Sequence, residues 1–174
     1  MVSKKIVLFT IASKNQTDKL ELVLEPNSIE EILSHVVDVL IGEYPACEMD
    51  LFIAENGKPI LVDFEYLSMA LILLLEIFVE IHSNHEKCRI EVDQFDDKWV
   101  IKILGLSQEF KDLFSNLPQD LTCDQVGKSP IMPTNKLKLF ILDKLLKPQH
   151  ICMEIGEKRD VFFIQLLIPT VGEI

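Results

Sequence analysis

The sequence is short of positive charge. Lysine and arginine together number 17, whereas aspartate and glutamate number 28, so the formal net charge at pH 7 is -11. An acidic chain repels the phosphate groups of nucleic acids and of anionic lipid surfaces. We therefore expect neither a nucleic-acid partner nor a membrane partner, whereas a basic protein surface would be attracted.

Long apolar runs and paired cysteines are also missing. The most apolar segment, Leu67–Leu75, is too short for a membrane span, which needs about 20 residues. The run Ile6–Ala12 is too short for a secretion signal, so we interpret it as part of a strand. The four cysteines are Cys47, Cys88, Cys123 and Cys152. Because they form no CxxC pair, we expect reduced cysteines, no metal site and a cytoplasmic protein.

The chain contains enough hydrophobic residues to form the core of one folded domain, residues 1–174. Hydrophobic residues make up 48% of the chain, which excludes a disordered protein. The apolar periodicity and the turn residues predict helices over Asn27/Ser28–Gly42, Phe64–Ile81, Ser107–Leu117 and Thr134–Lys147. They predict strands over Lys5–Ile11, Lys19–Leu24, Met49–Ala54, Cys88–Val92, Lys98–Leu104, Ile151–Ile155 and Val161–Ile168. The first two strands would form an N-terminal hairpin extension, residues 1–24, and the last two would turn at Gly156–Asp160.

The helix patterns place the core. In the first helix, apolar residues recur at three-and-four spacing, which predicts one apolar face: Ile29, Ile32, Leu33, Val36, Val37, Leu40 and Ile41. The second helix is apolar all round in its middle and should lie at the centre of the core. We predict four buried side chains there: Leu71, Leu74, Leu75 and Phe78. The element order predicts an α+β fold, a two-layer sandwich of a mixed, mostly antiparallel sheet with helices on one face.

Three segments resemble a known family. They are LELVLEPNSIEEILSHVVDVL (Leu20–Leu40), PILVDFEYLSMALILLLEIFVEI (Pro59–Ile81) and KLKLFILDKLLKPQHICMEIGEKRDVFFIQLLIP (Lys136–Pro169). Their pattern is similar to the ATP-binding domain of histidine kinases, a fold shared with gyrase, Hsp90 and MutL. Asp63 and Leu67 fit the D-x-x-x-L that opens the second kinase segment. The resemblance implies the histidine kinase ATPase-like fold for residues 20 to 169.

The residues that hold ATP in those kinases are missing here. The asparagines of the second kinase helix, which help to hold magnesium, align with Leu73 and Ile77, and neither side chain can bind a metal. The kinase D-x-G-x-G aligns with Leu104–Gln108, which has no aspartate. The glycines of the kinase G-L-G-L align with Lys136 and Lys138, so the close backbone approach is blocked, although a lysine could still meet a phosphate. We therefore expect no nucleotide cofactor and no ATP-dependent kinase activity.

The bacterial histidine phosphotransferases resemble a histidine kinase with these same losses. They are dimers in which a helical hairpin carries the phosphorylated histidine and a degenerate ATP-binding domain docks response regulators. This chain resembles the second domain; with about 27 residues before the first helix, it has no room there for the hairpin. The resemblance implies a phosphorelay protein with a response regulator or histidine kinase as partner and with homodimerisation among the options. The alternative is an interaction module without phosphotransfer.

No histidine or acid pair identifies a catalytic residue, so the catalytic set is left unassigned. His35 lies beside the apolar face of the first helix and is expected to be partly buried. His85 precedes Glu86, as in phosphoacceptor segments, but it lies in a loop. His82 and His150 are expected just after helices. The segment Leu117–Pro133 takes the place of the kinase ATP lid and should either collapse into the vacant pocket or contribute to a docking face.

Overall fold

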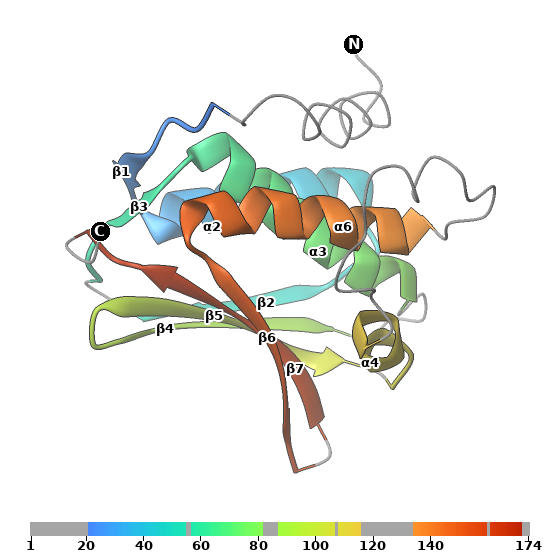
Figure 1. The fold of residues 1–174 in the computed structure, drawn as a ribbon. Coiled ribbons are helices and arrows are strands. Elements are labelled where there is room, and N and C mark those ends of the chain that lie inside the picture. The colour runs from blue at the N-terminus through green and yellow to red at the C-terminus, as the bar shows by residue number, and fades with distance from the viewer. Residues whose placement is uncertain are drawn as a thin grey trace.

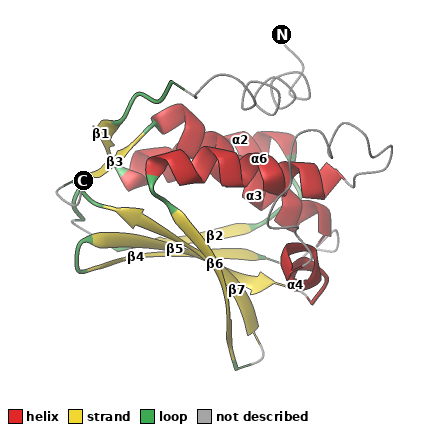
Figure 2. Ribbon diagram, viewed as in Figure 1, coloured by secondary structure: helices red, strands yellow, loops and turns green. Residues whose placement is uncertain are grey.

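The computed structural model describes residues 21–54, 57–81, 87–106, 108–115, 134–159 and 161–171. The described elements form two layers, shown in Figure 1 and by element type in Figure 2. The helices are α2 (Ile29–Glu43), α3 (Phe64–Ile81), α4 (Gln108–Ser115), α6 (Thr134–Leu146) and the 3-10 turn η1 (Lys147–Gln149). The strands are β1 (Glu25–Asn27), β2 (Met49–Ile53), β3 (Ile60–Val62), β4 (Cys88–Phe95), β5 (Lys98–Leu106), β6 (Cys152–Lys158) and β7 (Val161–Pro169).

The main sheet has five strands in the order β2-β4-β5-β7-β6, and β1 pairs with β3 in a separate two-stranded ribbon. The β2–β4 pair is parallel, and the other three pairs are antiparallel. Helices α2, α3 and α6 lie on one face of this sheet (Figure 1), and α4 lies beside one end of it. The predicted α+β two-layer class with a mixed, mostly antiparallel sheet is confirmed.

Helix α3 is the centre of the core, as its composition predicts. It lies between α2 and α6 and above the sheet. All four side chains predicted to be buried are 1% exposed or less: Leu71, Leu74, Leu75 and Phe78. The described part of the chain contains no helix with the length and apolar character needed to cross a membrane.

Asp63 fixes the start of α3 and joins three segments. Its carboxylate accepts hydrogen bonds from the backbone N–H of Tyr66 at 3.0 Å and of Val23 at 2.9 Å. The first of these bonds caps the helix, whose opening N–H groups have no partner within it. The backbone N–H of Asp63 donates to the side chain of fully buried Gln149 at 2.8 Å. Asp63, which matches the aspartate of the kinase D-x-x-x-L, therefore links the start of α3 to the backbone at Val23 and to the side chain of Gln149.

Two strand predictions are corrected. The described part of the predicted strand Lys19–Leu24, residues 21–24, is not in a strand. Among the described residues, strand pairing begins at Glu25–Asn27, which pair with β3. The strand predicted at Lys5–Ile11, and with it most of the N-terminal hairpin, lies outside the described residues. The final turn is also shorter than predicted, because β6 continues through Gly156 to Lys158 and pairs with β7 along its length.

The apolar face of α2 is narrower than predicted. Ile29, Ile32, Leu33, Val36 and Leu40 are buried, as expected. In contrast, Val37 is only partly buried, and Ile41 is 48% exposed. The buried side chains of α2 are therefore those that face α3 and the sheet. Val37 and Ile41, which were predicted to belong to the apolar face, border solvent. Ser28 precedes the helix in an extended conformation, but its side chain makes no capping hydrogen bond.

Candidate functional site

The candidate site is the region where α3 and α6 meet, because two of the three kinase nucleotide motifs align with these helices. The positions of the kinase asparagines lie inside the apolar core. Leu73 is 1% exposed and Ile77 is fully buried. Apolar side chains that pack against neighbouring helices offer no oxygen to a cation, and magnesium requires oxygen ligands.

The first kinase glycine-motif position continues the sheet in this protein. Strand β5 extends through Leu106, with a bulge between Leu104 and Leu106 in its pairing with β7. Gly105 sits in that bulge at φ +82°, a left-handed conformation that favours glycine. Helix α4 begins at Gln108 immediately beyond it. Gly105 therefore allows the bulge in the strand. The segment Leu104–Gln108 contains no aspartate, unlike the kinase motif with which it aligns.

Lys138, one of the two positions aligned with the second kinase glycine motif, belongs to a buried ion cluster. Lys138 of α6 places its ammonium nitrogen 2.6 Å from Glu80 Oε1 and 3.4 Å from Glu76 Oε2, and both glutamates belong to α3. The side chains of Lys138 and Glu76 are 7% and 4% exposed, whereas that of Glu80 is 37% exposed. Burial on this scale requires a charge to be paired, and these three charges satisfy one another.

The cluster fixes where the Lys138 charge points. The sequence left open that a lysine at this position could meet a phosphate. In the folded chain its ammonium group is directed at the two carboxylates of Glu76 and Glu80. The side chain of Lys136, the other replaced glycine, is outside the described set. The sequence analysis did not identify Glu76 and Glu80 as site residues, and the available signal was their four-residue spacing on one helix face.

The predicted lid segment Leu117–Pro133 lies outside the described residues, so the choice between collapse and docking stays a prediction.

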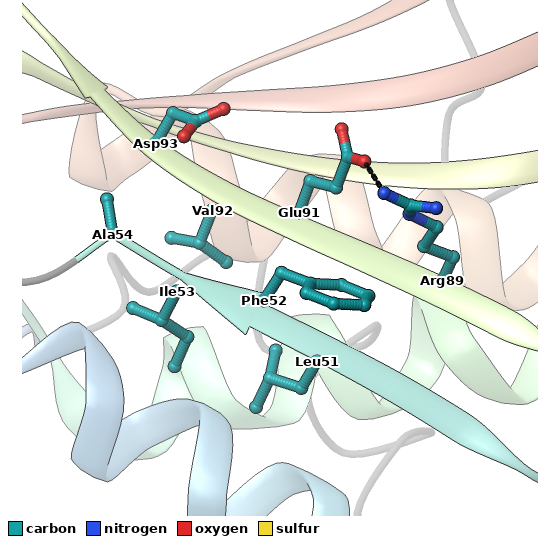
Figure 3. A pocket seen from close by; sticks show the side chains of 8 residues that line it. All are labelled: Leu51, Phe52, Ile53, Ala54, Arg89, Glu91, Val92 and Asp93. Carbon is teal, nitrogen blue, oxygen red and sulfur yellow. Dashed lines mark ion pairs between the residues drawn. The ribbon is translucent and has the colours of Figure 1, made fainter.

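A cavity in the described part of the chain lies away from the positions aligned with the kinase motifs, over β2 and β4 (Figure 3). It has a volume of about 600 Å³ and is lined by Phe52, Arg89, Glu91 and Asp93, among others. It shares no residue with the three kinase motif positions.

The histidine predictions are corrected in one case. His35 is exposed, because it lies on the outer face of α2 together with Glu31 and Asp38. Its ring contacts that of Phe64, at the start of α3, with centroids 5.6 Å apart. His150 follows η1 directly, as predicted, and is exposed in a left-handed conformation at φ 58°. His82 and His85 lie outside the described residues.

The described cysteines form no site. Cys47, Cys88 and Cys152 are unlinked, and Cys123 lies outside the described residues. Burial, followed by the proximity of Cys47, raises the pKa of the Cys88 thiol to about 12. A thiol with a raised pKa is a poor nucleophile and a poor metal ligand at neutral pH. No three histidine, cysteine or acidic residues in the described segments are grouped so that they could hold a metal ion.

Solved structures of histidine kinase domains share this fold. Histidine kinase AdeS of Acinetobacter baumannii matches with a TM-score of 0.67 and 15% identity, over 96% of this chain and 77% of that chain. The mycobacterial sensor histidine kinase MprB matches with a TM-score of 0.61 and 15% identity, over 85% and 98% of the two chains. Histidine kinase ThkA in complex with response regulator protein TrrA gives 0.64 and 17%, over 98% and 49%.

The chain therefore has the fold of a histidine kinase ATPase domain. Identities of 13 to 17% establish the fold alone. Neither a protein-family model nor a curated protein matches the sequence.

Proposed function

We propose that this chain is a two-component signalling protein that docks a response regulator or a histidine kinase without binding ATP, in the manner of the histidine phosphotransferases. The histidine kinase fold supports the signalling role, and one of the similar structures is a kinase in complex with a response regulator. The observation that carries the ATP part is the buried ion cluster of Lys138, Glu76 and Glu80.

Three features of the positions aligned with the kinase motifs disfavour a nucleotide. A glycine-rich loop lets its backbone N–H groups approach phosphates closely, and a lysine side chain in that place prevents the approach. The Lys138 ammonium is neutralised by the two α3 carboxylates. The core positions Leu73 and Ile77 provide no replacement for the missing metal ligands.

Thermal unfolding in the presence of ATP and magnesium tests this part. A ligand at about a hundred times its dissociation constant stabilises the folded state by ~2.7 kcal/mol, which is readily visible as a rise in Tm. We expect no rise in Tm at millimolar Mg-ATP. The histidine kinase ShkA, whose structure was solved in complex with AMPPNP, provides the positive control. A rise in Tm comparable to that of ShkA would contradict the proposal.

Phosphotransfer is tested with a response regulator of the same organism, phosphorylated by acetyl phosphate. Phosphate should move to this chain as an acid-labile phosphohistidine. Among the described histidines His35 and His150 are exposed, so His35→Gln and His150→Asn identify the acceptor, if it is one of these two. Regulator binding without labelling would favour the alternative, an interaction module without chemistry. Neither binding nor labelling with any regulator of that organism would contradict the signalling role.

A further inference from the structure

The face of the main sheet opposite α2, α3 and α6 carries no described helix (Figure 2), and we name it the open face. Side chains alternate between the two faces of a strand, so the cross-strand register defines its members. Its central row runs across all five strands through Phe52, Glu91, Lys102, Gln165 and Glu154. Every second residue of each strand, counted from this row and in β5 only as far as the bulge after Leu104, belongs to the open face.

The open face is electrically neutral in a strongly acidic protein. Its four acidic residues are Asp50, Glu91, Asp93 and Glu154, and its four basic residues are Arg89, Lys98, Lys102 and Lys158. The other described residues include 17 acidic and 8 basic side chains, a net formal charge of -9. The described surplus of negative charge therefore lies entirely outside the open face.

The open face also holds large exposed apolar side chains. Phe52 is 50% exposed, Phe95 is 56% exposed and Val161 is 46% exposed. The guanidinium of Arg89 lies over the Phe52 ring at 4.7 Å and donates to Glu91 Oε1 at 2.7 Å (Figure 3). The charge beside the aromatic ring is thus already paired within the chain. An aromatic residue next to a paired arginine is the combination that dominates protein interfaces.

We propose that the open face binds a second copy of this chain, sheet against sheet. Two copies that approach through their other surfaces bring net charges of the same sign together, which is unfavourable. On the open face four charges of each sign meet an identical set, so a two-fold arrangement can place opposite charges across the interface. Two sheets packed in this way lie about 10 Å apart, with strands inclined by about 30°.

The area of the open face approaches that of a standard dimer interface. Five strands at about 4.8 Å spacing span roughly 24 Å, and about seven residues per strand at ~3.3 Å span roughly 23 Å. The projected area is roughly 550 Å², and the accessible area of its side chains is larger. A standard interface buries about 800 Å² on each partner. This inference does not depend on the signalling role, since a second copy is the partner whatever the function is.

Sedimentation velocity of the whole chain from about 1 to 300 µM tests the dimer. We expect a dimer whose dissociation constant rises at least about tenfold in Phe52→Glu and in Phe95→Glu, because each introduces charge among the apolar anchors. The matched control is Ile41→Glu. Ile41 is 48% exposed on the acidic outer face of α2, and this substitution should leave the dimer unchanged. Circular dichroism establishes that each variant is folded.

Salt provides an independent readout. Salt screens both the repulsion between the two acidic subunits and the opposite-charge contacts across the interface, so the dimer should persist from 50 to 500 mM NaCl through its apolar anchors. A wild-type chain that stays monomeric at 300 µM in 500 mM NaCl would overturn the inference. It would also be overturned by a dimer that Ile41→Glu disrupts as strongly as Phe52→Glu, or by one that salt dissociates.

Discussion

Replacing Lys138 with methionine isolates the energy of the buried ion cluster. The variant keeps an unbranched side chain but removes the ammonium group that lies 3.4 Å from the carboxylate of Glu76, whose side chain is 4% exposed. Removing one partner of a buried ion pair costs about 3–5 kcal/mol, because the remaining charge stays desolvated. The Glu80 contact is 37% exposed and adds little, about 0.5 kcal/mol after solvent screening. We expect Lys138→Met to lower the free energy of unfolding by about 3 kcal/mol, measured by urea denaturation at pH 7.

Two further variants sharpen the test. Lys147→Met removes an exposed pair with Asp143, whose side chains are 72% and 43% exposed, and should cost about 0.5 kcal/mol or less. The double variant Lys138→Met/Glu76→Gln removes both charges and should recover much of the loss, because neutral replacement of a buried pair is often tolerated. A loss for Lys138→Met no larger than for Lys147→Met would refute the reasoning.

Two other predictions concern Cys88 and the glycines. The raised pKa of Cys88, about 12 against 9.0 when unperturbed, means that its contribution to stability is complete below pH 9 and disappears between pH 9 and 12. Between pH 7 and 10 wild type should therefore lose about 1 kcal/mol more than Cys88→Val in urea unfolding, and equal losses would contradict this. A Cβ on Gly57 would overlap the indole ring of Trp99, whereas one on Gly42, in the last turn of α2, meets nothing within 4 Å. Gly57→Ala should destabilise by ~1–3 kcal/mol and Gly42→Ala should stabilise by ~0.5–1 kcal/mol, and a reversed order of their Tm values would contradict both placements.

Local sequence patterns predicted the helices and strands that are specified by residues within or next to the element itself. Helix α3 is predicted with its observed bounds because Asp63 provides a cap and an unbroken apolar run follows. The hairpin of β4 and β5 is predicted from the alternation around Asp96 and Asp97. The side chains at the positions aligned with the three nucleotide motifs were also readable in sequence, because residue identity is a property of one position.

Contacts between distant segments could not be predicted in this way. Lys138 and Glu80 are 58 residues apart, so no local periodicity connects them. Strand β1 contains Pro26, which strand propensity disfavours, and forms only through its pairing with β3. His35 was expected to be partly buried because it borders the apolar stripe, but the position of α3 makes the buried stripe narrow and leaves this side chain outside.

The strand order has a consequence for how the chain folds during synthesis. Strand β5 is central in the sheet, yet one of its neighbours is β7, whose residues are made more than 50 positions later. Until β7 emerges, β5 presents an unpaired edge that includes Trp99, Ile101 and Ile103. Contacts of such long sequence separation form slowly, and an exposed apolar edge favours aggregation in the meantime. Nascent chains shorter than about 161 residues should therefore depend on chaperones, whereas the full chain closes its own sheet.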